Sequence, residues 1–194
     1  MAGYVSQGKA LRRSGAHLGD DIFVTGTLGD AAAALRCLAV TPKQEAHRQL
    51  LERLNRPVPR VETGLLLGDW ASACIDVSDG LLADLGHILE QSGLGATLYS
   101  HRLPISEALK STFPQTEQQQ QLALTGGDDY ELCFTLPAAR RDEALAELQG
   151  SPCPITHIGQ IEAQAGISLL DEHNNPVTLP EKSGFEHFSG KSSS

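Results

Sequence analysis

The chain has little of several features that mark particular protein classes. It has four widely spaced cysteines without a C-x-x-C pair, and its seven histidines show no zinc-ligand spacing. It has no run of about 18 apolar residues that could span a bilayer, and its first residues lack the apolar stretch of a secretory signal. The sequence therefore predicts a cytoplasmic protein with reduced, structural cysteines and no membrane partner.

Positive charge is also scarce. The 194 residues include 15 Lys and Arg against 24 Asp and Glu, a net charge of −9. A nucleic-acid surface needs a Lys/Arg patch; none is visible beyond Lys9, Arg12 and Arg13, so we expect no nucleic-acid partner. The proportions of 40% hydrophobic and 20% charged residues are typical of an ordinary globular protein. The length allows one large domain, or a domain with an appendage.

The most informative stretch is residues 72–91. Its apolar, β-branched start at 73–77 predicts a buried strand, and leucines and isoleucine at helical spacing from Leu81 predict a helix directly after it. The turn between them holds Asp76, Ser78 and Asp79. A helix N-terminus attracts phosphate, but two carboxylates would repel it unless a cation lay between them, and Mg²⁺ suits such oxygen ligands. Alternatively, Ser78 or Asp79 merely caps the helix, an interpretation that this segment alone slightly favours.

A second dense stretch lies at residues 124–134. Alternating Tyr130, Leu132 and Phe134 predict a strand with one buried face. Two glycines lead into it and two acids stand at its start, the first of them Asp128. Either this is a Gly-Gly turn whose Asp side chains bond their own backbone, or the glycines free the backbone to present a carboxylate to a ligand. The residues alone leave both interpretations open.

Two further segments have weaker signals. The glycine turn at 26–29 follows a predicted strand at 21–25 and precedes an Ala-rich helix, capped by Asp30 and running to about Val40. Without the Lys-Ser/Thr of a P-loop, a structural turn is favoured there over a phosphate loop. Arg13, in a basic connector, could hold a phosphate with its planar fork or lie in a solvated loop. Further helices are predicted at 43–54, 61–70, from 106 and at 137–149, and further strands at 96–99, 155–161, 167–170 and 176–179.

Taken together, five motifs resemble the C-terminal two-thirds of bacterial thiamine-monophosphate kinases. They are R-S-G-A-x-x-G-D at 13–20, V-T-G-T-L-G-D at 24–30, R-P-x-P-R at 56–60, I-D-V-S-D-G-L-L-A-D-L-G-H at 75–87 and T-G-G-D-D-Y-E-L-C-F at 125–134. The resemblance runs from about Gly3 to Phe188. It implies the aminoimidazole ribonucleotide synthetase-like superfamily and an α+β fold, a layered α/β sandwich with a mixed sheet.

The resemblance also implies a reaction and its residues. Magnesium-dependent transfer of the γ-phosphate of ATP to thiamine monophosphate would give thiamine diphosphate. Asp76 and Asp79 would bind Mg²⁺, Ser78 and Arg13 would contact ATP, and Asp128 would bind thiamine monophosphate. Phe185 stands where the family carries an aromatic residue beside the substrate, often Tyr or Trp. Asp128 stands where the family often has Glu, one methylene longer.

The family has an upstream N-terminal domain that carries further metal ligands, a nucleotide loop and a homodimer interface. We therefore expect residues 1–16 to be its remnant and connector, 17–188 the C-terminal α+β domain and 189–194 a disordered tail. The chain would hold half of an active site, be inactive alone and expose an apolar face. The alternatives are another member of the superfamily, such as a selenophosphate or aminoimidazole ribonucleotide synthetase, or a non-catalytic nucleotide-binding or assembly fragment.

Overall fold

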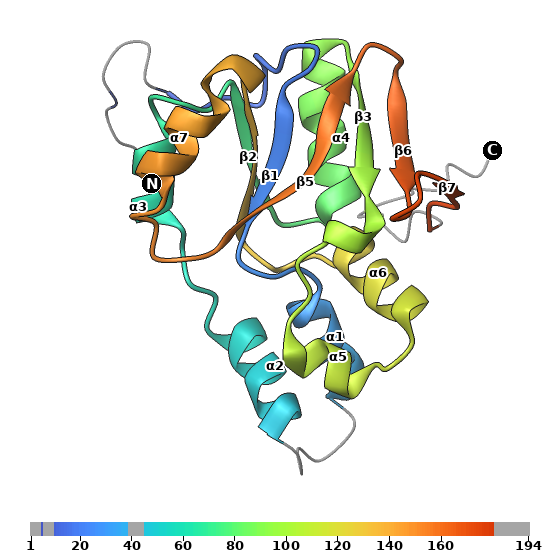
Figure 1. The fold of residues 1–194 in the computed structure, drawn as a ribbon. Coiled ribbons are helices and arrows are strands. Elements are labelled where there is room, and N and C mark those ends of the chain that lie inside the picture. Colours follow the sequence, from blue (N-terminus) through green and yellow to red (C-terminus); the bar gives the residue numbers. More distant parts are fainter. Residues whose placement is uncertain (1–4, 6–9, 39–44, 181–194) are drawn as a thin grey trace, which may run out of the picture.

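The computed structural model describes residues 5, 10–38 and 45–180. These residues form a seven-stranded mixed sheet with helices packed on it, the α+β layered architecture that was predicted (Figure 1). The strand order is β2-β4-β1-β5-β3-β6-β7; β3 and β6 pair in parallel, and the other neighbours are antiparallel. The strands are β1 Asp21–Thr25, β2 Ala73–Val77, β3 Gly95–Tyr99, β4 Glu131–Leu136, β5 Ile155–Glu162, β6 Gly166–Leu170 and β7 Pro176–Val177.

Helices cover both faces of the sheet and one of its ends. Helix α4 packs on one face, α3 and α7 pack on the other, and α1, α2 and α5 lie together beyond the end of the sheet (Figure 1). No described helix is long and apolar enough to cross a membrane. The helices are α1 Asp30–Cys37, α2 Glu45–Asn55, α3 Val61–Leu67, α4 Leu81–Ser92, α5 Glu107–Thr112, α6 Thr116–Thr125 and α7 Arg141–Leu148, with 3₁₀ turns at Ser100–Arg102 and Ala138–Arg140.

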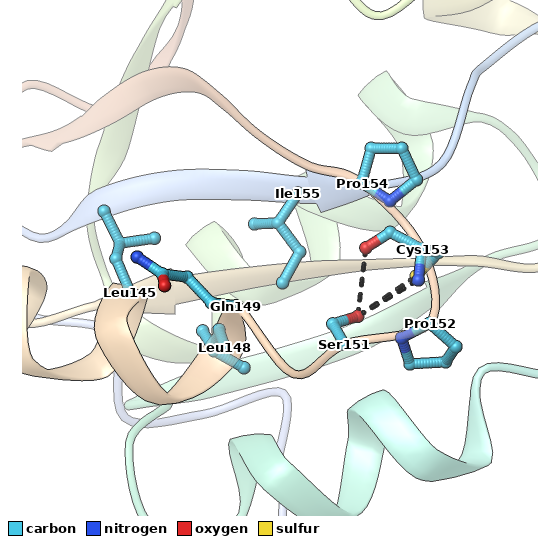
Figure 2. Close-up of a pocket in the computed structure, with 8 residues that line it drawn as sticks. All are labelled: Leu145, Leu148, Gln149, Ser151, Pro152, Cys153, Pro154 and Ile155. Atoms are coloured by element: carbon cyan, nitrogen blue, oxygen red, sulfur yellow. Dashed lines mark hydrogen bonds between the residues drawn. The ribbon is translucent and has the colours of Figure 1, made fainter.

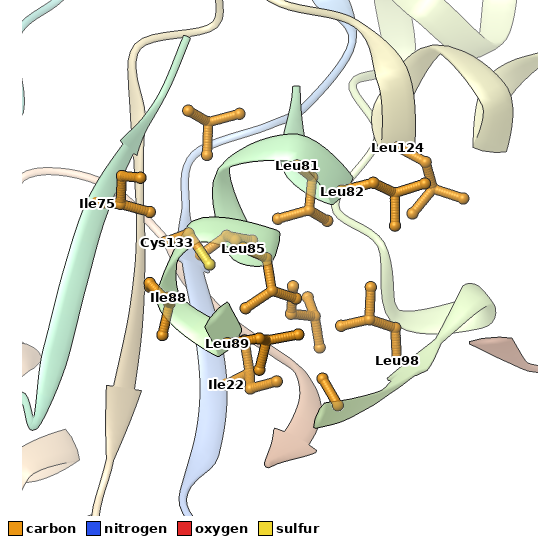
Figure 3. Packing of buried hydrophobic residues seen from close by; sticks show 14 of the residues in the cluster. Ile22, Ile75, Leu81, Leu82, Leu85, Ile88, Leu89, Leu98, Leu124 and Cys133 are labelled. Atoms are coloured by element: carbon orange, nitrogen blue, oxygen red, sulfur yellow. The ribbon is translucent and has the colours of Figure 1, made fainter. Parts of the chain in front are cut away.

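The largest core lies between the sheet and α4 (Figure 3). Leu85 and Ile88 of α4 are fully buried there, against Ile22 of β1 and Leu98 of β3 among others. A fully buried aliphatic side chain contributes about 1.5–3 kcal/mol. The helical spacing seen in the sequence therefore produces a helix that is anchored along its length. That anchoring fixes the position of the turn that precedes it.

The opposite face carries a second core. Phe23 of β1 stacks on Phe134 of β4, with ring centroids 5.6 Å apart. Leu67 of α3 and Leu148 of α7 are buried against them, and the partly buried Trp70 packs against the same cluster. Phe23 therefore belongs to a different core from its neighbour Ile22, as strand alternation requires.

Strand β4 corrects one prediction. A single buried face was expected, yet Glu131, Cys133 and Thr135 are all fully buried. The reason is topological: β4 lies between β2 and β1, and helices cover both faces at that point. The polar members of the alternating pattern thus face the interior and require partners there.

Several local predictions can also be compared with the structure. The helix predicted from residue 106 is α5, and Ser106 is its N-cap, accepting a hydrogen bond from the Leu109 amide at 3.0 Å. Asp30 was expected to cap α1, but Gly29 takes that position with φ of 85° and Asp30 is the first helical residue. Helix α1 ends at Cys37 with Leu38 as its C-cap residue, so it stops short of the predicted end near Val40; residues 39 and 40 themselves lie outside the described residues. The helix predicted at 137–149 begins with a 3₁₀ turn and is α-helical only as α7.

Candidate functional site

The turn between β2 and α4 carries Asp76, Ser78 and Asp79, as the sequence predicted. Asp76 is the one exposed residue of β2, and the other four residues of the strand are buried. Asp79 is exposed and Ser78 is half-buried. Two carboxylates therefore reach solvent from one short turn.

The N–H groups of residues 78–80 have an internal partner, which corrects the interpretation that Ser78 or Asp79 caps the helix. The Asp84 carboxylate accepts hydrogen bonds from the amides of Ser78 and Asp79 at 2.9 Å each and of Gly80 at 3.2 Å. Gly80 is the N-cap residue of α4, and no side chain caps at that position. The cap was expected from Ser78 or Asp79. Instead, the carboxylate of Asp84, in the first turn of the helix, binds the amides of the N-cap residue and of the two residues before it.

The T-G-G-D-D-Y-E stretch packs directly on this turn. The Asp128 amide donates to the Ser78 carbonyl and the Tyr130 amide to the Val77 carbonyl, both at 2.9 Å. A Cβ on Gly127 would lie 2.5 Å from the Ser78 carbonyl oxygen, so only glycine fits. The two motifs, about fifty residues apart in the sequence, are thus hydrogen-bonded neighbours.

Asp128 and Tyr130 adopt an uncommon backbone conformation. Their φ angles are 65° and 51°, a region that L-residues other than glycine rarely occupy. Both side chains are exposed, and the Tyr130 hydroxyl donates to Asp128 Oδ1 at 3.2 Å. The charge and hydrogen bond of Asp128 raise the pKa of Tyr130, and the charges of Asp76 and Asp79 add to the shift. We call Asp76, Asp79 and Asp128 the carboxylate cluster. All three contribute to the raised pKa of Tyr130.

The carboxylate cluster has no compensating cation among the described residues: Asp76, Asp79 and Asp128 take part in no ion pair there. Carboxylate oxygens of this kind suit Mg²⁺, which is commonly held by one or two carboxylates, with water and phosphate oxygens completing its shell. Within the described residues, however, no three Asp, Glu, His or Cys side chains are placed to hold one ion together. The cluster therefore fits a partial ligand set.

Two of the predicted site residues are not part of this cluster. Arg13 is exposed beside the start of β2, where the preceding carbonyl, of Arg12, accepts from the Cys74 amide at 2.7 Å. Among the described residues it pairs with none of the three acids. Phe185 and the predicted tail 189–194 lie outside the described residues.

A buried ionic network behind the cluster was not predicted. The Glu131 carboxylate is fully buried and accepts from Arg60 Nη2 and Nε at 2.6 and 2.7 Å, from Arg53 Nη2 at 2.6 Å and from Thr25 Oγ1 at 2.6 Å. Burial acts to raise the pKa of Glu131, but these hydrogen bonds and charges outweigh it and the pKa is lowered. The R-P-x-P-R motif was the sequence feature that could have indicated this network, since its last residue is Arg60.

Asp129 links the second motif to the glycine turn before α1. Its carboxylate accepts from the amides of Gly29 at 2.7 Å and Ala31 at 3.4 Å. Burial raises its pKa to about 7, although both hydrogen bonds oppose the rise. The preference for a structural turn at 26–29 is therefore supported, because an internal carboxylate occupies the amides that a phosphate would need.

Two hollows of the structure lie away from the carboxylate cluster. One of 420 Å³ is lined by the end of α7 and the loop leading to β5, including Leu148, Ser151 and Ile155 (Figure 2). The Ser151 hydroxyl there is satisfied by the Cys153 carbonyl at 3.0 Å. Another of 590 Å³ lies between α2 and α5, beside Arg53 and Ser106. The cluster itself is an exposed surface rather than an enclosed pocket.

Comparison with known proteins agrees with the motif resemblance. The thiamine-monophosphate kinase of Salmonella typhimurium is 45% identical over 194 residues, covering 96% of this chain and 58% of its own length. The crystal structure of the Stenotrophomonas maltophilia enzyme superposes with a TM-score of 0.79 at 46% identity, over 85% of this chain and 54% of that one. AaThiL, solved in complex with AMPPCP and TMP, gives 0.74 at 34% identity, over 92% and 54%.

The chain thus spans a little over half the length of the curated relatives it matches. Its similarity to them covers both motif stretches of the carboxylate cluster. The family model described as AIR synthase related protein, C-terminal domain, matches residues 18–172, which include every strand of the sheet except β7. The chain belongs to this family of AIR synthase related C-terminal domains.

Proposed function

We propose that the chain is the C-terminal part of a thiamine-monophosphate kinase, which transfers the γ-phosphate of ATP to thiamine monophosphate. The observation that carries this is the carboxylate cluster: three acids from two distant segments reach one surface without a paired cation among the described residues. The relatives named thiamine-monophosphate kinase, and the complex of AaThiL with AMPPCP and TMP, support the choice of reaction and substrates.

Each predicted residue has a proposed role in this reaction. Asp76 and Asp79 hold Mg²⁺, which neutralises charge between two anionic substrates. Ser78 contacts ATP from the same turn, and Arg13 contacts it from the connector. Asp128 binds thiamine monophosphate, with its carboxylate oriented by the Tyr130 hydroxyl.

Phe185 supplies a ring beside the thiamine monophosphate.

The chemistry needs no covalent nucleophile from the protein. A terminal phosphate oxygen of thiamine monophosphate forms a bond to the γ-phosphorus, and the bond from that phosphorus to the oxygen of the leaving ADP breaks. The protein contributes positioning and charge neutralisation. The acceptor is already an anion near neutral pH, so it needs no strong base. The rigid attachment of both motifs to one sheet supports this positioning role.

We further propose that activity requires the part of the relatives that this chain does not span. In that longer protein residues 17–188 form the C-terminal domain, the protein is a cytoplasmic homodimer, and the remaining metal ligands come from the N-terminal domain. The partial ligand set of the described residues supports this division of the site.

A chimera tests the proposal: this chain replaces the matching 58% of the Salmonella typhimurium kinase, and thiamine diphosphate formation is measured with Mg²⁺-ATP. We expect turnover by the chimera and none by this chain alone. Asp76→Asn should reduce turnover at least roughly 100-fold, since even outer-shell partners of a metal contribute 10–100-fold. The exposed Glu143 of α7 provides the matched control, and Glu143→Gln should retain full turnover.

The outcomes separate the alternatives. Turnover by this chain alone would show that the rest of the relatives' length is dispensable. A folded chimera that binds Mg²⁺-ATP without turnover would favour the non-catalytic nucleotide-binding fragment. Turnover of another phosphate acceptor or of selenide, in place of thiamine monophosphate, would favour a different member of the superfamily.

A further inference from the structure

The connector that carries Arg13 is fastened to the start of β2, the outermost strand on that side of the sheet. The Arg12 carbonyl accepts a hydrogen bond from the Cys74 amide at 2.7 Å. Three residues later, a Cβ on Gly15 would lie 2.6 Å from the Ser72 carbonyl oxygen, so only glycine can approach this closely. Residue numbers rise along the connector while they fall along the strand beside it. The connector therefore runs antiparallel to the start of β2.

The far end of the connector is held by a buried carboxylate. Asp20 is 3% exposed, and it accepts hydrogen bonds from the Ser72 hydroxyl and, at 3.0 Å, from the His17 amide. The Ser72 hydroxyl also lies 2.6 Å from the hydroxyl of Thr135 in β4 and 3.2 Å from its carbonyl oxygen. Since a carboxylate is the stronger acceptor, the one hydroxyl proton of Ser72 goes to Asp20, and Thr135 donates to Ser72. A line of hydrogen bonds thus runs from β4 to the connector.

The backbone around Asp20 is fixed as well. The Ile161 amide donates to the Asp20 carbonyl at 2.8 Å, which ties the end of the connector to β5. Ala16 is 6% exposed and belongs to the largest core. Arg13 therefore lies between two anchored points of the connector.

These anchors place Arg13 relative to the carboxylate cluster. Arg12 lies beside Cys74, and Asp76 is two residues further along β2, a distance of roughly 6.6 Å along the strand. The Arg13 side chain is exposed, so packing does not fix its direction. The position of its Cα atom, which the connector sets, then decides which part of a ligand its guanidinium can reach.

We infer that Asp20 and Ser72 are positioning residues for the kinase reaction: their hydrogen bond holds the connector on the start of β2, so that Arg13 reaches the phosphate groups of ATP bound at the end of that strand. This rests on the proposed function, which assigns an ATP contact to Arg13. A hydrogen bond with a purely structural role would stabilise the fold without altering the affinity for ATP. Coupling between Ser72 and Arg13 in nucleotide binding therefore distinguishes the two roles.

The test is a double-mutant cycle in the chimera with the Salmonella typhimurium kinase. Calorimetry measures the Kd of AMPPCP, the analogue present in the AaThiL complex, with Mg²⁺ and without any need for turnover. Arg13→Ala should raise the Kd at least about tenfold, because it removes a charged donor to phosphate. Ser72→Ala should raise it about three- to tenfold, the effect of one hydrogen bond. In the double variant the Kd should equal that of Arg13→Ala alone, since Ser72 acts through Arg13.

Three further variants control for structural effects. Asp20→Ala should behave as Ser72→Ala does, whereas Ser72→Thr retains the hydroxyl and should restore the Kd of the unaltered chimera. Thr63→Val removes a buried hydroxyl from a separate network, in which Thr63 lies 2.9 Å from the Ser151 hydroxyl. It should lower the urea concentration of unfolding and leave the Kd unchanged.

The possible failures are distinguishable. The inference is overturned if Ser72→Ala raises the Kd by the same factor with and without Arg13, because the two residues then act independently. An unchanged Kd in Ser72→Ala would also overturn it, and this milder variant decides the matter if Asp20→Ala does not fold. An unchanged Kd in Arg13→Ala would instead remove the proposed contact between Arg13 and ATP, and the inference with it.

Discussion

Two strained residues mark the carboxylate cluster at the residue scale. Asp128 and Tyr130 hold positive φ angles, which cost of order 1–3 kcal/mol each unless their surroundings enforce them. Two hydrogen bonds enforce this conformation: the Asp128 amide donates to the carbonyl of Ser78, and the Tyr130 amide donates to the carbonyl of Val77 at the end of β2. The strain turns both side chains outward to the same surface, which is consistent with a binding role.

The first prediction concerns the hydroxyl of Tyr130. Asp128→Asn removes the charge that contributes most to raising the pKa of Tyr130, so that pKa should fall. Adding Mg²⁺ to the unaltered chain should lower it too, since the cation would cancel the charges of Asp76 and Asp79. NMR titration of the Tyr130 ring measures both effects. Glu117→Gln, at an exposed position of α6, should leave the pKa where it is; an unchanged value in Asp128→Asn would show that the acid does not act on this hydroxyl.

At the scale of elements, β4 joins the cluster to the rest of the fold. Its first residue, Glu131, pairs with Val77 of β2 in the sheet and receives side-chain hydrogen bonds from Arg60 and Arg53. Arg60 precedes α3 and Arg53 lies on α2, so one buried carboxylate ties two helical segments to the strand. The segment that presents Asp128 is thereby fixed from behind.

The second prediction compares a buried ion pair with an exposed one. Arg60→Ala leaves Glu131 buried with only part of its compensation, and such losses cost about 3–5 kcal/mol of unfolding free energy. Arg53 still pairs with Glu131, so we expect the lower end of this range. Arg48→Ala breaks an exposed pair with Glu45 within α2 and should cost less than about 1 kcal/mol. Urea denaturation of both variants measures the difference, and equal costs would contradict a stabilising role for the buried network.

On the scale of the whole molecule, two neighbouring buried acids respond oppositely to pH. Glu131 has a lowered pKa because its arginine partners outweigh burial, whereas burial raises the pKa of Asp129 to about 7. Glu131 therefore contributes stability that is present above its unfolded pKa and lost as pH falls through the folded one. Asp129 has a raised folded pKa, so its contribution is largest in acid and is lost as pH rises toward 7.

The third prediction follows from the raised pKa of Asp129. Between pH 5 and the folded pKa of about 7, the folded chain holds a proton on Asp129 that the unfolded chain has released, so its unfolding free energy should decrease as pH rises. The Asp129→Asn variant has no titratable group at this position. It should lack this pH-dependent part of the unfolding free energy, which amounts to about 1.4 kcal/mol per pKa unit. Urea denaturation at several pH values gives the difference between the two proteins. Glu117→Gln should follow the unaltered chain, and parallel pH profiles for Asp129→Asn would contradict the raised pKa.

Much of this molecule followed from local sequence. The strand at 73–77, the helix from Leu81, the helix from residue 106 and the strand at 167–170 appear as predicted, because hydrophobic periodicity and capping act over a few residues. The same local motifs identified Asp76, Asp79 and Asp128 as acids at the ends of strands. The four cysteines, which were expected to be reduced and structural, are free and buried.

Tertiary structure decided the rest, because it depends on contacts between distant residues. Strand β4 is buried on both faces only because the sheet places it between β2 and β1, so Glu131 required arginines from two other segments. No local sequence pattern indicates that Gly127 must lie against Ser78, or that three acids raise the pKa of Tyr130. In the sequence, nothing distinguishes Asp84 from any other acidic residue in the first turn of a helix. Only the folded turn brings the amides of residues 78–80 to its carboxylate.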